Sequence, residues 1–272
     1  MEAKTLLFAL VSFLLPGLVI PGRGAAAERE RIEIITGVSY EEGDFGTEVN
    51  SRTVIVPFTV RYLGDRFDMG LTIPFVYQDS AEAVTIVGGR PERIRDDPVS
   101  VAADQLAPGG GDLLFKGRYY LFDDPGLDSY LPGIVPFAKI KFPTANENEG
   151  LGTGKFDYGF GLEFDKQIHD FFLFADTGYT FIGEPANTNL RDKISAGGGF
   201  GYQILDSLSA SVALAWSRSL VRDTDDPVDI ITSMTWDITG KTSFSPFASF
   251  GLSNGSPDFG IGFAVSYRFW RF

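Results

Sequence analysis

Eight charged residues near the middle of the chain are spaced so that they can share one interior. The basic members come first and the acidic members follow: Lys116, Arg118, Lys139, Lys141, Asp157, Glu163, Asp165 and Asp176. An even spacing within a β-strand places side chains on the same face. If the strands that carry them are neighbours, opposite charges can pair across the interior and set up a transverse field. We therefore predict that these residues form a charge lattice in a lumen.

This charge lattice has two interpretations. In the functional interpretation it selects and orients small solutes, as charged rings do in pores. In the structural interpretation it fills the lumen of a narrow barrel and ties the strands together. The sequence leaves both open.

The elements that position these side chains are strands, because short segments along the whole chain alternate apolar and polar residues. In the first segment Ile32, Ile34 and Val38 alternate with Glu33 and Ser39. The apolar faces carry no charge, and a Lys or Arg facing hydrocarbon at the bilayer midplane costs about 2 to 4 kcal/mol. The pattern predicts an all-β protein, a transmembrane antiparallel up-and-down β-barrel of about 12 strands over residues 28–272. A soluble β-sandwich also alternates and stays an alternative.

The lengths of the connections favour the barrel over the sandwich. Odd-numbered connections are mostly longer than even-numbered ones; Asp79 to Gly111 is the longest, and Asp123 to Leu131 is a long exception among the even set. Outer-membrane barrels have short periplasmic turns and longer external loops. The segment from Asp79 to Gly111 can fold into the lumen as a constriction or a plug, and the sequence does not choose.

Aromatic residues gather near the expected strand ends. Tyr40, Tyr77, Phe181 and Trp216 lie toward the outer rim, and Tyr62, Tyr202, Trp236 and Phe269 lie toward the periplasmic rim. Two such girdles are typical of the two membrane interfaces. A general preference of aromatic residues for strands is the competing explanation.

The N-terminus has the features of a secretory signal peptide. Lys4 precedes an apolar run from Thr5 to Ile20, and three alanines precede Glu28. This run contains Pro16 and is too short for a spanning helix, which favours cleavage over anchoring. Removing residues 1–27 takes away two basic residues and one acidic residue, so the net charge changes from -13 to -14. That acidity disfavours a nucleic-acid partner, and the lack of cysteine excludes disulfides and thiol catalysis.

The chain ends on Phe272. Outer-membrane barrels resemble one another in ending on a strand whose last residue is Phe, which the barrel-insertion machinery is thought to read. Here the apolar face reaches Phe269, after which Trp270, Arg271 and Phe272 follow in the other register. We expect either a β-bulge near Trp270 or three residues that trail beyond the strand.

Three short motifs lie around the charge lattice. They are Gly109-Gly-Gly-Asp112 before a strand, Lys141-Phe-Pro143-Thr144-Ala145 at a strand end, and Leu151-Gly-Thr153-Gly154-Lys-Phe-Asp157 before the next strand. In this order the segment resembles the outer-membrane transporters grouped as the phenol-degradation meta-pathway family, most closely over residues 109–165. Ala145 stands where the family usually has Gly. The resemblance implies an outer-membrane barrel connected with uptake of aromatic compounds, without established catalytic residues.

Residues suited to catalysis or metal binding are sparse. His169, the single histidine, lies in an even-numbered turn beside Asp170, and neighbours in sequence rarely have the geometry of a general base. Carboxylates that could bind Ca²⁺ cluster in the fifth odd loop, but acidic loops are more often simply solvated. They are Asp223, Asp225, Asp226 and Asp229. We predict no enzyme activity, no cofactor and no resident metal.

The sequence therefore predicts a channel or transporter in the outer membrane of a Gram-negative-type bacterium. It would pass small solutes, aromatic or hydrophobic compounds among them, and its partners would be outer-membrane lipid, the barrel-insertion machinery acting on Phe272, and the solute. The alternative is a structural or adhesive surface protein that binds partners through its long external loops. A membrane-embedded hydrolase is a third and weaker reading.

Overall fold

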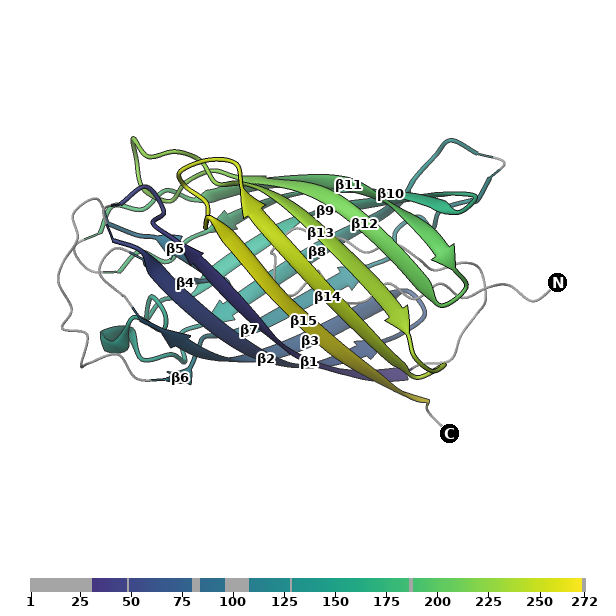
Figure 1. Cartoon of the computed structure of the whole chain (residues 1–272), viewed down its shortest axis with the longest axis horizontal. Helices are drawn as coiled ribbons and strands as arrows, with labels where there is room; N and C mark the ends of the chain where they lie inside the picture. Colours follow the sequence, from purple (N-terminus) through teal and green to yellow (C-terminus); the bar gives the residue numbers. More distant parts are fainter. Residues whose placement is uncertain are drawn as a thin grey trace.

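A closed β-barrel makes up most of the protein. The computed structural model describes residues 31–47, 49–79, 84–95, 108–127, 129–185 and 188–270. Twelve long antiparallel strands form the wall (Figure 1). They are β1 (Arg31–Gly43), β2 (Ser51–Leu63), β3 (Phe67–Gln78), β7 (Leu113–Tyr119), β8 (Gly133–Phe142), β9 (Asp157–Ile168), β10 (Phe171–Phe181), β11 (Lys193–Leu205), β12 (Leu208–Ser217), β13 (Val228–Asp237), β14 (Thr242–Gly251) and β15 (Phe259–Trp270). The prediction of an up-and-down barrel of about 12 strands is confirmed.

Pairing of the first and last strands closes the barrel. The register of β1 with β15 runs from Arg31 opposite Trp270 to Glu42 opposite Phe259. Between β3 and β7 the chain adds β6 (Gly109–Gly110), which pairs with β3 ahead of β7. Together β6 and β7 act as one wall strand that is interrupted at Gly111 and Asp112. Closure pairs both edges of each of the twelve long strands described, which leaves none of them as an edge strand.

The two faces of the wall are inverted relative to a soluble protein. Apolar side chains point outward and are half exposed, as for Phe75 (52%) and Ile261 (57%). Charged side chains point inward and are buried, as for Glu33 (0%) and Asp68 (1%). A soluble sandwich would bury its apolar faces against each other. The outward apolar surface is therefore the one that hydrocarbon would cover.

Four phenylalanines in the wall strands point into the lumen, and each lies directly opposite a glycine of the neighbouring strand. The pairs are Phe137 with Gly161, Phe172 with Gly201, Phe174 with Gly199 and Phe247 with Gly262. In every pair a Cβ on the glycine would lie within 2.7 Å of the phenyl ring. The glycines thus leave slots that the rings fill, an arrangement that stabilises glycine-containing strands. It gives a reason for the high glycine content, 32 residues.

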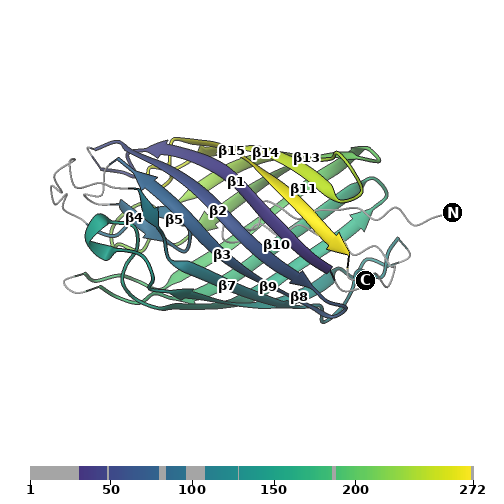
Figure 2. The ribbon, with the colours of Figure 1, turned by 90° about the horizontal axis from the view of Figure 1, so that it is seen from below.

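The two ends of the barrel differ as the connection lengths predict. At one end, the short-turn end, β15 finishes and connections such as His169–Asp170 are tight; the connection after β7 is the long exception. The other end, the long-loop end, carries the odd connections, including the 3-10 helix η2 (Glu147–Glu149). Figures 1 and 2 show these ends at the right and left of the barrel. The predicted aromatic girdles fit this arrangement, since Tyr77 and Trp236 are exposed on the outer face near opposite ends.

A two-stranded hairpin occupies the lumen at the long-loop end. It consists of β4 (Val84–Val87) and β5 (Arg90–Arg93), joined by a turn at Gly88 and Gly89, which both have positive φ. Its strands are nearly all buried. Both views place β4 and β5 at the end of the barrel away from the end of β15 (Figures 1 and 2). The described part of the longest loop therefore folds as a plug.

The predicted bulge near Trp270 is wrong for the described residues. The register of β15 against β1 continues without a shift through Trp270, because Arg31 extends β1 far enough to pair with it. A register shift occurs instead between Gln203 and Leu205, where β11 meets β12. Phe272 and the predicted signal peptide, residues 1–27, lie outside the described residues. Within the described part of the chain, no helix has the length and apolarity to cross a bilayer.

Candidate functional site in the barrel lumen

The predicted charge lattice forms in part. Glu163 of β9 lies between two cations of β7, accepting from Lys116 Nζ at 2.7 Å and from Arg118 Nε at 2.9 Å. Lys141 of β8 pairs with Asp157 of β9 at 2.9 Å. All five side chains are buried or nearly so. Basic and acidic members therefore meet across neighbouring and next-neighbouring strands, as their inward register predicts.

Three members of the predicted lattice are not joined to it. Lys139, Asp165 and Asp176 all point inward, but within the described residues none of them forms an ion pair. Both carboxylate oxygens of Asp176 are buried without a hydrogen-bond partner. Sequence spacing gives the face of a strand, but the height at which opposite charges meet depends on strand stagger. That stagger was not available from the pattern.

A second set of ion pairs, which the alternating pattern did not predict, crosses five strands toward the short-turn end. We call it the ion girdle, and its members are Arg268, Glu33, Arg61, Asp68 and Arg118. The distances along it are 3.3 Å from Arg268 to Glu33, 3.7 Å from Glu33 to Arg61, 2.5 Å from Arg61 to Asp68 and 3.5 Å from Asp68 to Arg118. Tyr120 also donates to Asp68 at 2.8 Å. In the sequence, the one sign of this ion girdle was the set of inward-facing charges near the ends of several strands.

Ion pairs also hold the plug hairpin to opposite sides of the wall. Arg90 lies 3.2 Å from Asp229 of β13 and 4.0 Å from Glu41 of β1. Glu92 pairs with Lys193 of β11. Because these partners belong to separated parts of the wall, the hairpin lies between them rather than beside the barrel.

The three sequence motifs build the seat of this hairpin. Asp112 Oδ1 accepts from the backbone N–H of Ala145, and its other oxygen lies 3.3 Å from Lys141 Nζ. Lys141 also donates to Thr153 Oγ1 at 2.5 Å. A Cβ on Gly152 would lie 2.7 Å from both Asp112 and Ala145, so the cluster needs glycine there. Ala145, which stands where the family usually has Gly, fits here because Gly152 has no side chain that would clash with its methyl group.

Apolar and polar contacts join that seat to the hairpin. Ile86 of β4 packs in a buried cluster with Leu151, Ile55 and Val76. Thr85 Oγ1 donates to the carbonyl of Gly150 at 2.5 Å. The loop between β8 and β9 thereby supports the plug from one side.

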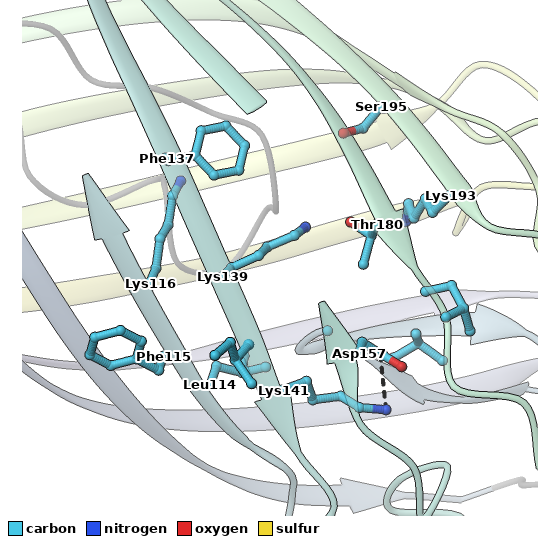
Figure 3. A pocket seen from close by; sticks show the side chains of 14 residues that line it. Leu114, Phe115, Lys116, Phe137, Lys139, Lys141, Asp157, Thr180, Lys193 and Ser195 are labelled. Carbon is cyan, nitrogen blue, oxygen red and sulfur yellow. Dashed lines mark ion pairs between the residues drawn. The ribbon is translucent and has the colours of Figure 1, made fainter. Parts of the chain in front are cut away.

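A cavity with a volume of about 70 Å³ lies beside the tip of the hairpin (Figure 3). We call it the lysine cavity, because Lys116, Lys139, Lys141 and Lys193 contribute to its lining. Phe137 supplies an aromatic wall, with the Lys116 ammonium 4.4 Å from the centre of its ring. The cavity therefore combines positive charge with apolar surface.

The residues considered for catalysis or Ca²⁺ binding lie apart. His169 occupies the turn between β9 and β10 with positive φ, at the short-turn end. Of the four aspartates, Asp229 pairs with Arg90 in the lumen, whereas Asp226 accepts the Ser219 backbone N–H and Asp225 accepts from Asn254. Within the described residues, no group of three or more His, Cys, Asp or Glu side chains is placed to hold a metal ion.

Solved structures with a similar fold are outer-membrane barrels. The translocator domain of the autotransporter NalP from Neisseria meningitidis is 10% identical, with a TM-score of 0.50, and the match covers 92% of this chain and 90% of that one. The KdgM porin is 10% identical, with a TM-score of 0.48 and coverage of 87% and 99%. The CymD monoaromatic hydrocarbon channel is 9% identical, with a TM-score of 0.44 and coverage of 90% and 89%. At these identities the likeness shows the fold alone.

The family relationship comes from the sequence. No curated protein matches it at a significant level. A family model described as "Putative MetA-pathway of phenol degradation" matches residues 30–269, which span the described barrel except for Trp270. The chain belongs to this family of phenol-degradation MetA-pathway proteins.

Proposed function

We propose that the protein is an outer-membrane channel that passes small solutes, aromatic or hydrophobic compounds among them, through a lumen gated by the β4–β5 hairpin. One observation carries the proposal. The hairpin fills the long-loop end and is held there largely by ion pairs, of Arg90 with Asp229 and of Glu92 with Lys193. The family description supports a solute of aromatic type.

The contacts that hold the hairpin are ionic on one side and apolar on the other. This mixture is better suited to a movable gate than to a fixed part of the core. The residues of these ion pairs are each at most 9% exposed, so the pairs hold the hairpin in place and separate only when water that enters the lumen hydrates both charges. The apolar contacts of the hairpin are concentrated at one side, around Ile86 and Leu151. We infer that the hairpin can leave its ionic partners on β11 and β13 while it stays anchored on that side.

The described lumen corresponds to the closed state of such a channel. The ion girdle lies toward the short-turn end, the four phenylalanines point into the lumen, and the side chains of both sets are at most 11% exposed. A barrel of this strand number lies between eight strands, whose interior is filled by side chains, and sixteen, which leave an open aqueous channel. Passage therefore requires rearrangement of lumen side chains in addition to movement of the hairpin.

We infer transport rather than catalysis, and a location in the outer membrane. The family and the fold are those of outer-membrane barrels, and the lone histidine, His169, lies in a turn at the end of the barrel away from the lysine cavity. The apolar outer face is suited to lipid contact. The remaining expected partner, the insertion machinery acting on Phe272, stays a prediction.

Recording from the purified barrel in planar bilayers tests this proposal. We expect discrete conductance steps in KCl, together with uptake of phenol by liposomes that contain the protein. Heat-modifiable migration in gels shows that the protein is folded. If folded protein gives neither conductance nor solute flux, the channel is ruled out.

A further inference from the structure

Lys139 differs from the other lysines of the lysine cavity. Lys116 pairs with Glu163, Lys141 with Asp157 and Lys193 with Glu92. In the part of the chain that the structure describes, Lys139 makes neither an ion pair nor a hydrogen bond. Buried or half-buried ammonium groups in proteins are normally paired, because an unpaired one loses hydration without compensation. This cavity therefore holds an ammonium group whose hydrogen-bonding capacity is unused.

The wall is shaped to keep Lys139 extended across the cavity. Its direct partner on β9 is Gly159, where a Cβ would lie 2.5 Å from Lys139 Cε and 2.9 Å from Thr180 Oγ1. The missing side chain lets the lysine cross β9 toward β10. Figure 3 shows the amino end of Lys139 directed toward Thr180, with Ser195 on the far side of the same space. The ammonium and two hydroxyl groups thus converge from three strands.

Apart from the four lysines, Asp157 and these two hydroxyl groups, the residues that line the cavity are apolar or glycine. Phe137, Leu114 and Val87 contribute to its lining, and Val87 comes from the tip of the hairpin. A polar cavity of this volume holds on the order of five water molecules, so a solute as large as one ring with an acidic group fits only when the hairpin tip at Val87 moves aside. A ligand that matches both the charged and the apolar parts of this lining has an acidic group that pairs with Lys139 and a compact apolar body that contacts the apolar side chains.

We propose that the lysine cavity is a binding subsite for a small organic monoanion, a carboxylate on a single apolar ring, with Lys139 as its charge partner. This inference rests on the proposed channel function and specifies its substrate class. Lysine binds a carboxylate as a point charge through charge-assisted hydrogen bonds. Because Val87 closes one side, movement of the hairpin would open the subsite toward the long-loop end.

Asp176 acts against this anion and keeps its binding weak. It lies on β10, points inward like Thr180, and its buried carboxylate oxygens have no hydrogen-bond partner. The other charges around the subsite are largely balanced, since Lys116, Lys141 and Lys193 each have an acidic partner. A channel needs sites that attract a solute but also release it. Asp176 does not line the cavity, but as an inward-facing anion on the strand of Thr180 it offsets the unpaired Lys139 and gives such a balance.

Equilibrium binding to the full mature barrel in non-ionic detergent tests the inference by isothermal titration calorimetry, with benzoate and its uncharged analogue benzyl alcohol as probes. We expect benzoate to bind about tenfold more tightly than benzyl alcohol, as one charge-assisted hydrogen bond allows. Lys139→Gln should remove this difference, and Lys139→Arg should largely keep it. Asp176→Asn should strengthen benzoate binding. Lys241→Gln, in an exposed turn at the other end of the barrel, is the matched control and should change nothing.

Two results would overturn the subsite. One is equal affinity for benzoate and benzyl alcohol in the wild-type protein, including no binding of either. The other is a Lys139→Gln barrel, folded by heat-modifiable migration, that still prefers benzoate as the wild type does. Binding needs no flux, so a protein without conductance can still pass this test. Conversely, a conducting channel without benzoate preference would refute the subsite and leave the proposed channel intact.

Discussion

Phe137 of β8 lies directly opposite Gly161 of β9, and its ring occupies the space that a side chain on Gly161 would need. A Cβ at Gly161 would lie 2.5 Å from the ring and 2.2 Å from the carbonyl oxygen of Thr177. The ring can turn aside, but the backbone carbonyl on β10 cannot move without distorting the ladder. The slot is therefore a property of the wall and of the ring together.

Gly161→Ala should accordingly destabilise the barrel. Overpacking of a filled interior costs about 1 to 3 kcal/mol, and we expect that loss in the free energy of unfolding measured by urea titration in detergent. Gly110→Ala is the matched control, since nothing lies within 4 Å of a Cβ there. Equal stability of the two variants would show that the Phe137 slot is not a packing constraint.

The ion girdle should be more sensitive to the loss of one member than surface pairs are. Glu33 is fully buried between Arg268 and Arg61, so Glu33→Gln removes the carboxylate that these two guanidinium groups share and leaves Arg61 with Asp68 and Arg268 with Asp237. Breaking a buried pair in this way costs about 3 to 5 kcal/mol. Arg52→Gln removes an exposed pair with Glu42, and we expect a change within about 1 kcal/mol. Urea unfolding of both variants makes the comparison, and similar losses would contradict the structural role of the girdle.

Weakening the attachment of the hairpin should increase conductance. Arg90→Gln removes the charge that binds Asp229 and approaches Glu41. Loss of a charge-assisted hydrogen bond worth about 1.5 to 3 kcal/mol should raise the open fraction at least about tenfold in bilayer recordings. Arg66→Gln, an exposed site in the turn between β2 and β3, should leave the conductance unchanged. An Arg90→Gln channel that opens no more often than wild type would refute gating by the hairpin.

The connection between β7 and β8 should loosen in acid. Burial raises the pKa of Asp124, but hydrogen bonds from the Lys166 ammonium and from the backbone N–H groups of Gln167 and Gly126 outweigh it and lower the pKa below its usual range. A carboxyl group with a lowered pKa stabilises the folded loop above its unfolded pKa, about 3.9 for Asp. This contribution is lost as the pH falls through the lower, folded pKa.

Hydrogen exchange of the Gln167 amide, corrected for the intrinsic rate, measures that loss. Protection should fall in strongly acidic solution in the wild type, and Asp124→Asn should show low protection at every pH. Protection of Gln167 that is independent of both pH and Asp124 would contradict the assignment.

The C-terminal prediction concerns assembly rather than stability. If the insertion machinery reads Phe272, as we predict, deleting this residue should lower the amount of heat-modifiable barrel in the outer membrane of cells. Refolding of the purified variant in detergent should proceed as in the wild type. An undiminished yield in cells would show that Phe272 is not read.

Much of this fold could be predicted from the sequence because a β-barrel wall has a period of two residues. Outward positions such as Ile32 were predicted correctly, because hydrocarbon contact excludes charge at each of them. The pairing of Arg268 with Glu33 could not be read in this way, since it depends on closure between the first and last strands. Lys139 and Asp176 were placed on the correct face, but their lack of partners depends on strand stagger. The hairpin stayed ambiguous because its short strands carry no long alternating pattern.

The attachment of Arg90 to both β1 and β13 has a consequence for the order of assembly. Its two acidic partners come from strands at opposite ends of the sequence, so both are in place only after β1 has met β15. Contacts between distant parts of a chain form late, because the intervening loop must close first. Docking of the hairpin should therefore be the last step of folding, after an open-ended barrel has already formed. During folding, the lumen would stay open to solvent until β15 pairs with β1. The hairpin would then dock and close the lumen.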